Sequence, residues 1–116
     1  MAYVPEQGHA VWLNFDPQAG HEQAGRRPAI VLTPAAYNRK IGLVLACPIT
    51  SHAKGYPFEV ALPEGLPVSG VALSDHVKSA DWRVRQASFI CMVPASTLSE
   101  IVAKLAALLP KPIRPI

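Results

Sequence analysis

The sequence predicts a mainly β fold that carries one C-terminal helix, a small, strongly curved antiparallel sheet or partly open barrel. Three observations support this prediction. Short apolar runs alternate with turn residues along the chain, twelve prolines punctuate its 116 residues, and only residues 97–109 keep a helical period. Because proline interrupts both helices and strands, many short elements are favoured over a few long ones. Short strands and a single helix favour a curved sheet with the helix packed on it.

The first half of the chain contains two strands and a short helix in this interpretation. Residues 10–15 alternate apolar and polar side chains, the period of a half-buried strand. Residues 29–32 form a second apolar run with β-branched side chains. Thr33 followed by Pro34 has the pattern of an N-cap with proline at the first helical position, which predicts a helix over residues 34–39.

Further apolar runs predict the remaining strands. A long polar loop over residues 50–57 separates the first two of them, and turn residues separate the others. The expected count reaches six or seven strands in all. The later ones cover residues 43–49, 58–62, 71–73, the stretch around 77–84, and 87–93.

The C-terminal helix is predicted from its start signal and its apolar stripe. Thr97 and Glu100 have the spacing of a capping box. Six apolar residues then follow the 3.6-residue period and are expected to pack on the core: Leu98, Ile101, Val102, Leu105, Leu108 and Leu109. Prolines from residue 110 onward stop the helix. We therefore expect a single domain over residues 1–110 and an extended or disordered proline-rich tail over residues 111–116.

Composition limits the class of protein. Eleven basic residues against eight acidic ones give a net charge of +3, which suits a polyanionic partner without proving one. Cys47 and Cys91 lack metal-type spacing and lie in apolar runs, so we expect buried free thiols, with one disulfide as the alternative. No metal or other cofactor is expected. The absence of a leader-type segment or of an apolar span predicts a cytoplasmic protein without a membrane segment.

A long polar loop between the first two strands is the most informative stretch. His21, Glu22 and Gln23 lie between two glycines, and Arg26, Arg27 and a proline then lead into the second strand. Long loops in compact domains are usually functional. The plain alternative is a solvated turn with scattered charges.

This loop and its flanks resemble the opening signature of the MazF/PemK toxin ribonucleases. The matching residues are Gly8, Trp12, Phe15-Asp16-Pro17, Gly20-His21-Glu22-Gln23-Ala24-Gly25 and Arg27-Pro28. The resemblance continues in collinear order through Pro48-Ile49-Thr50, Lys54-Gly55-Tyr56-Pro57-Phe58-Glu59-Val60, Gly70-Val71-Ala72-Leu73-Ser74-Asp75 and Trp82-Arg83-Val84-Arg85. It covers nearly the whole chain.

The resemblance implies a fold, an activity and partners. The fold would be the SH3-like, partly open barrel of the CcdB, MazF and PemK toxins, assembled as a homodimer. The activity would be sequence-specific, metal-independent cleavage of single-stranded mRNA by the toxin of a type II toxin–antitoxin system. The partner would be an antitoxin whose flexible acidic C-terminal segment folds onto the toxin dimer. Arg27 and Thr50 would be catalytic, because they occupy the positions of the family's arginine and threonine.

The residues themselves fit this chemistry. RNA cleavage without a metal needs a base for the 2′-OH proton, a cation for the charge on phosphorus and an acid for the 5′ oxygen. The guanidinium of Arg27 matches phosphate oxygens, and Pro28 fixes the backbone beside it. A plain ion pair between Arg27 and Glu22 is the alternative. Thr50 alone indicates only a turn residue.

Two carboxylates are candidates for the general base. Glu22 could orient Arg27 or accept the 2′-OH proton, and the neighbouring His21 could shuttle protons. Asp75 matches an aspartate proposed as the base in the PemK-like branch of the family. That branch carries an arginine two positions earlier, where this chain has Leu73. The departure favours a mechanism built on Arg27 and Thr50.

Seven polar or basic residues are predicted to contact RNA, although each basic one fits ordinary solvated charge as well. They are His21, Gln23, Arg26, Lys54, Lys78, Arg83 and Arg85. Two other functions compete with RNA cleavage: a CcdB-like gyrase poison and a nucleic-acid-binding barrel that cleaves nothing. The gyrase poison uses a tryptophan close to the C-terminus, whereas both tryptophans of this chain, Trp12 and Trp82, are far from it.

Overall fold

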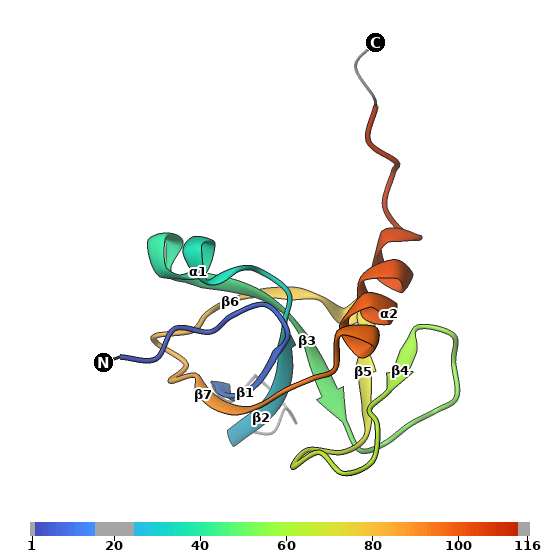
Figure 1. The fold of residues 1–116 in the computed structure, drawn as a ribbon, viewed down its shortest axis with the longest axis horizontal. Coiled ribbons are helices and arrows are strands. Elements are labelled where there is room, and N and C mark those ends of the chain that lie inside the picture. Colours follow the sequence, from blue (N-terminus) through green and yellow to red (C-terminus); the bar gives the residue numbers. More distant parts are fainter. Residues whose placement is uncertain (1, 16–24, 114–116) are drawn as a thin grey trace, which may run out of the picture.

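The computed structural model describes residues 2–15 and 25–113, which form an antiparallel sheet, two α-helices and a short 3-10 helix (Figure 1). The strands are β1 (His9–Phe15), β2 (Gly25–Val31), β3 (Leu43–Thr50), β4 (Glu59–Ala61), β5 (Val71–Leu73), β6 (Lys78–Asp81) and β7 (Ser88–Met92). The helices are α1 (Ala35–Ile41), η1 (Ser74–His76) and α2 (Ala95–Ala106).

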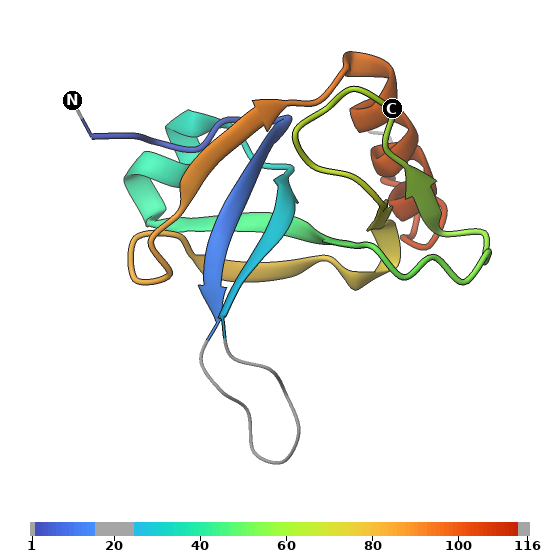
Figure 2. The ribbon, with the colours of Figure 1, turned by 90° about the horizontal axis from the view of Figure 1, so that it is seen from below.

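Strand β3 is the centre of the sheet. The strand order is β4-β5-β3-β2-β1-β7, with β6 pairing β3 beside this path, and every pairing is antiparallel. The first half of β3 pairs with β6 through residues 43–46, and its end pairs with β5 through Ile49 and Thr50. In the described residues no pairing joins β4 to β7, so the sheet stays open (Figure 2). The predicted mainly β fold with a C-terminal helix is confirmed.

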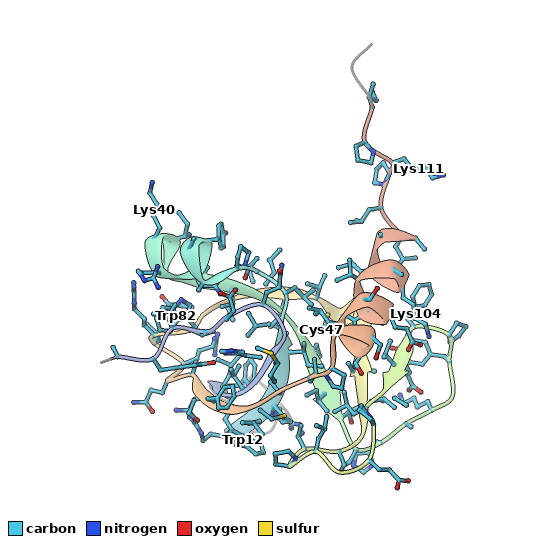
Figure 3. The ribbon with its side chains drawn as sticks, in the orientation of Figure 1. Trp12, Lys40, Cys47, Trp82, Lys104 and Lys111 are labelled. Atoms are coloured by element: carbon cyan, nitrogen blue, oxygen red, sulfur yellow. The ribbon has the colours of Figure 1, made fainter. Side chains whose placement is uncertain are left out.

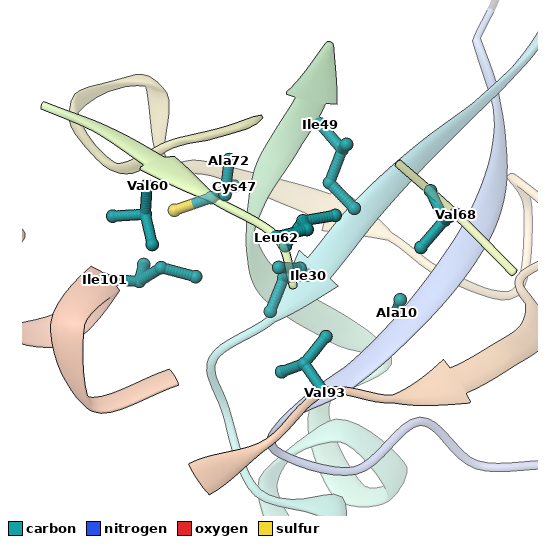
Figure 4. Packing of buried hydrophobic residues seen from close by; sticks show 10 residues of the cluster. All are labelled: Ala10, Ile30, Cys47, Ile49, Val60, Leu62, Val68, Ala72, Val93 and Ile101. Carbon is teal, nitrogen blue, oxygen red and sulfur yellow. The ribbon is translucent and has the colours of Figure 1, made fainter. Parts of the chain in front are cut away.

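Both faces of the central strands are buried. On one face a core lies between the sheet and α2, where Ile101 faces Val60 and Cys47 (Figure 4). On the other face Val11, Leu13 and their neighbours on β2, β3 and β6 pack around Trp82. Residues 10 and 11 are both buried, at a bulge in the pairing of β1 with β7. The expected alternation therefore holds only beyond this bulge.

Helix α1 starts differently from the prediction. Its N-cap is Pro34, which offers no side-chain hydrogen bond, so the predicted N-cap at Thr33 is wrong. The Thr33 hydroxyl instead donates to the Asn38 Oδ1 atom at 2.7 Å and accepts from the Leu45 amide at 3.1 Å. The first helical amide is satisfied by a remote carboxylate, because the Ala35 N–H donates to Glu6 at 2.9 Å.

Helix α2 also departs from the prediction at both ends. It begins at Ala95, with Pro94 as N-cap and without a side-chain cap, so the predicted capping box at Thr97 and Glu100 is wrong. Thr97 is buried within the helix. The helix ends at Ala106, and the chain then leads away from the sheet, with Lys111 beyond the helix (Figure 3).

The predicted core stripe of α2 is only partly buried. Ile101 is fully buried and Leu98 packs beside it. Val102, Leu108 and Leu109 are 47, 51 and 56% exposed, so the expectation that they pack on the core is wrong. Leu108 and Leu109 follow the last helical residue, Ala106, so the helical stripe does not extend to them. Near the end of the helix, the Lys104 ammonium donates to the Glu59 carbonyl oxygen on β4 at 3.0 Å.

The cysteines do not pair. Cys47 is fully buried on β3, whereas Cys91 on β7 is only partly buried, and both thiols are free. The expectation of free thiols is confirmed, and the open alternative of a disulfide is not seen. In the described part of the chain no helix is long and apolar enough to cross a membrane.

Candidate functional site

Arg27 and Thr50, the two residues predicted to be catalytic from the family resemblance, come together where β2 and β3 lie side by side. A cavity of about 440 Å³ opens there, and the side chains at the ends of the two strands line it. Arg27 and Pro28 come from β2, and Thr50 comes from β3. The full lining comprises Trp12, Arg26, Arg27, Pro28, Ile49, Thr50, Ser51, His52, Pro67, Val68 and Ser69.

Arg27 is held by a strand, although the sequence predicted a loop position. Strand β2 starts at Gly25, four residues earlier than expected, and Arg27 pairs with Leu13 of β1. The pairing with β1 continues to Phe15, so it draws both arginines into the ladder. The exposed Arg27 side chain thus projects into the cavity from a regular backbone.

Thr50 ends β3 and begins the polar loop. Its side-chain oxygen accepts a hydrogen bond from the His52 amide at 3.1 Å, which fixes the first turn of that loop. Opposite Thr50 lies Val71, preceded by Gly70. The half-buried threonine therefore has a defined position at the cavity wall.

A second cavity of about 410 Å³ adjoins the first. Thr50 and His52 line both cavities, so these two residues form the wall between them. The remaining lining of the second cavity is mostly titratable: Lys54, Tyr56, Glu59, Leu73, Asp75 and His76. The structure thus separates Arg27 from Asp75 by a shared wall, whereas the sequence analysis treated them as one set.

Asp75 lies at the centre of a small hydrogen-bonded group. The Tyr56 hydroxyl donates to the Asp75 Oδ1 atom at 3.0 Å, and the His76 Nε2 atom lies 3.8 Å from the same oxygen. Partial burial, followed by the hydrogen bond to Asp75, raises the pKa of Tyr56. Tyr56 therefore stays a neutral donor that fixes the orientation of the carboxylate.

Glu59 orders the loop that carries Lys54. Its two carboxylate oxygens accept the backbone N–H groups of Lys54 and Gly55 at 2.8 and 2.9 Å. This bidentate contact places Lys54 at the second cavity, and its contact with RNA stays a prediction.

The other predicted cations are engaged elsewhere. Lys78 and Arg85 both lie over the Phe15 ring, at 4.9 and 5.1 Å from its centre. Arg83 stacks on Trp82 and donates to the Arg39 carbonyl oxygen at 2.9 Å. None of these three lines either cavity.

Arg26 lines the first cavity, but its side chain is held by hydrogen bonds to three other residues. Its guanidinium donates to the Asn14 side chain at 2.6 Å, to the Gln86 carbonyl oxygen at 2.8 Å and to the Ser88 hydroxyl at 2.6 Å. These bonds join β2 to β1, to the turn after β6 and to β7. The predicted residues His21, Glu22 and Gln23 lie outside the described residues.

Sequence reasoning missed two residues of the site. His52 and Tyr56 both belong to the polar loop that the sequence did predict, and the structure places them on the cavity walls. The available signal for His52 was its spacing of two residues from Thr50. Among the described residues no group of three or more histidine, cysteine, aspartate or glutamate side chains could hold a metal ion.

Comparison with known proteins decides the family. Residues 6–109 match the model of the PemK-like, MazF-like toxins of type II toxin–antitoxin systems. The chain belongs to this family. It is 50% identical over 107 residues to the endoribonuclease toxin MazF of Escherichia coli K12, covering 92% of this chain and 96% of that protein. It is 34% identical to the endoribonuclease PemK of Escherichia coli, covering 90% of this chain and 81% of that protein.

Solved structures of the family agree with the fold. A MazE–MazF structure from Deinococcus radiodurans matches with a TM-score of 0.88 and 63% identity, over 92% of this chain and 96% of that one. A MazF structure from the same organism matches with a TM-score of 0.85 and 63% identity, over 92% of this chain and 97% of that one. The named relatives of this toxin family are endoribonucleases.

Proposed function

We propose that the chain is a toxin endoribonuclease that cleaves single-stranded mRNA at the cavity shared by Arg27 and Thr50. One observation carries the proposal: a chain of this endoribonuclease family brings a guanidinium and a hydroxyl to the wall of one open cavity. A guanidinium binds phosphate oxygens through two parallel hydrogen bonds, and a hydroxyl adds a third donor. The indole of Trp12 lines the same cavity and offers an aromatic surface for a base.

The proposed reaction is attack by the substrate's own 2′-OH on the adjacent phosphorus. Arg27 stabilises the negative charge that develops on the phosphoryl oxygens, which is the task a metal ion performs in other nucleases. Thr50 positions the phosphate. Among the residues that the structure describes, Asp75 is the candidate for the general base. Tyr56 donates to its Oδ1 atom, and its other carboxylate oxygen can accept the 2′-OH proton. Glu22 is the second candidate.

The products distinguish this route from others. Purified protein is incubated with a pool of single-stranded RNA in EDTA, and the ends of the fragments are identified by mass spectrometry. We expect 2′,3′-cyclic phosphate, or the 3′-phosphate formed from it, and 5′-OH ends. A single 2′-deoxy substitution on the 5′ side of the cut should block cleavage and permit binding. Fragments with 5′-phosphate ends would contradict the route, and an absence of cutting would favour a gyrase poison or a barrel that only binds.

The control of this activity is proposed to lie with an antitoxin. The Deinococcus radiodurans relatives include MazE–MazF structures, which supports a partner of that kind. Arg26, Arg27 and Lys54 line the cavities and give them positive charge. An acidic, flexible antitoxin segment with a few large apolar residues would compete with RNA for these cavities. The toxin itself is proposed to act as a homodimer in the cytoplasm.

A peptide tests the proposed control. An acidic peptide from the gene product encoded beside this chain should bind one toxin dimer and inhibit cleavage, with an affinity that falls as salt rises. Arg27→Ala should weaken the binding further. Binding that leaves cleavage unchanged, or that is indifferent to salt, would show that peptide and RNA use different surfaces.

A further inference from the structure

His52 stands apart from the other described histidines. His9 is partly buried and hydrogen-bonded to the Tyr3 hydroxyl at 2.7 Å, and His76 lies 3.4 Å from the Tyr56 hydroxyl. The His52 side chain is exposed, and among the described residues it makes no hydrogen bond and no ion pair. The His52 side chain therefore makes no contact of this kind that would stabilise the fold.

The position of His52 is nonetheless well defined. Its backbone N–H donates to the Thr50 side-chain oxygen at 3.1 Å, which ties the residue to the end of β3. With Thr50 it lines both the cavity of Arg27 and the cavity of Asp75. Because His52 lines both cavities, substrate held in either of them would lie next to this residue.

We infer that His52 is the general acid of the cleavage reaction, an inference that rests on the function proposed above. An imidazole can give and take a proton near neutral pH, which suits it to protonate a departing alkoxide. The charged and titratable groups that line the two cavities with it are Arg26, Arg27, Lys54, Tyr56, Glu59, Asp75 and His76. Among these groups, only the imidazoles both carry a proton to donate and exchange it readily near neutral pH. The Tyr56 hydroxyl is less suited to act as the acid, because it already donates to Asp75.

In the proposed step one bond to phosphorus forms, another breaks, and two protons move. The 2′ oxygen forms a bond to phosphorus, and its proton passes to the carboxylate base, for which Asp75 is the described candidate. The bond from phosphorus to the 5′ oxygen breaks, and the His52 imidazolium gives its proton to that oxygen. The products are a 2′,3′-cyclic phosphate and a 5′-OH, with the carboxyl protonated and the imidazole neutral. Exchange with water restores both groups.

A modified substrate tests whether His52 acts as the general acid or in another role. RNA with sulfur in place of the scissile 5′ oxygen releases a thiolate, which leaves without being protonated. We expect His52→Gln to cut ordinary RNA about 10² to 10³ times more slowly, within the usual range for a lost general acid. The same variant should cut the sulfur-substituted RNA within a few-fold of the wild-type rate. Arg27→Ala should be slow on both substrates, because its task does not depend on the leaving group.

Controls and pH give independent readouts. His9→Gln changes the same side chain at a position that lines neither cavity, so its cleavage rate should stay near that of the wild type in the folded protein. In the wild type kcat should fall as pH rises and the acid loses its proton, and His52→Gln should lack this alkaline limb. Circular dichroism verifies that each variant is folded.

The outcomes distinguish this inference from the proposed function. A wild type that cuts no RNA overturns the function. A wild type that cuts, with His52→Gln equally fast on ordinary RNA, leaves the function intact and overturns the role of His52. An equal loss on ordinary and sulfur-substituted RNA also overturns it, because His52 would then bind or position the substrate.

Discussion

Gly70 lies against the carbonyl group of Thr50, with no room for a side chain between them. A Cβ atom built on Gly70 would contact the Thr50 carbonyl oxygen, lie 2.9 Å from the carbonyl carbon and lie 3.2 Å from the Ser51 Cα atom. The glycine also has a φ of +117°, a conformation that other residues rarely adopt. Gly70 directly precedes β5, so this close approach fixes the end of β3 at Thr50, on the wall between the two cavities, against the start of β5.

Replacing Gly70 should therefore damage the site through the backbone. Gly70→Ala should displace Thr50, lower the free energy of unfolding by about 1 to 3 kcal/mol and slow cleavage in the protein that remains folded. Gly65→Ala is the matched control, because Gly65 also has a positive φ but has no atom within 4 Å of its added Cβ. Denaturant unfolding and cleavage rates measure both effects. Equal activity in the two alanine variants would show that the contact does not position Thr50.

Arg26 and Arg27 should separate into a structural and a catalytic arginine. Arg26 donates three hydrogen bonds to Asn14, Gln86 and Ser88. Arg26→Ala should lower the free energy of unfolding by about 1 kcal/mol, the net value of one typical hydrogen bond, because all three bonds are exposed and water replaces much of their contribution. Its cleavage rate should fall far less than that of Arg27→Ala. An unfolding midpoint unchanged in urea would contradict the structural role.

Stability should fall in mildly acidic solution because of His9. Burial lowers the pKa of His9 in the folded protein, and the nearby charge of Glu6 offsets this only in part. The unfolded chain then binds the proton more readily, so the stabilisation is complete above the ordinary histidine value of about 6.5 and declines as pH falls through the lowered value. His9→Gln should show a flatter dependence of Tm between pH 7.5 and pH 5. Parallel curves for the two proteins would exclude His9 as the cause.

The two thiols should differ in reactivity. Burial, with a smaller contribution from the charge of Asp75, raises the pKa of Cys47 to about 11, and partial burial raises the pKa of Cys91. The thiolate is the reactive form, so both should alkylate slowly at pH 8 in the folded protein. Cys91 should react before Cys47, because the buried Cys47 becomes accessible only when the protein unfolds. Mass spectrometry of peptides after a timed exposure to iodoacetamide gives the order, and faster labelling of Cys47 would contradict the packing around β3.

The sequence predicted what depends on local pattern. Alternation placed β1, the apolar run from Leu43 to Ile49 placed β3, and the single helical stripe placed α2. Local patterns failed where a remote partner decides. The sequence pattern predicted Thr33 and Thr97 as N-caps. Instead, the carboxylate of Glu6 accepts the first amide of α1, and Thr97 is a buried residue inside α2.

Of the predicted site residues, Arg27, Thr50 and Asp75 line the two cavities, but the layout of the site was not predicted. The polar run before β2 suggested a loop, yet pairing with β1 extends the strand to Gly25 and carries Arg27 with it. The wall formed by Thr50 and His52 depends on the pairing of β3 with β5, which joins residues twenty positions apart or more. The spacing of nearby residues in the sequence cannot predict such a long-range contact.

The cleavage rate of Arg27→Ala tests the central claim most directly. Removing one preorganised donor to a developing anion typically costs about 10² to 10³ in rate, so we predict a loss of that size with unchanged circular dichroism. Lys111→Ala is the matched control, since it removes a cation that lies beyond α2 and outside both cavities (Figure 3), and it should cleave like the wild type. A folded Arg27→Ala protein that cuts single-stranded RNA at near the wild-type rate would contradict the account.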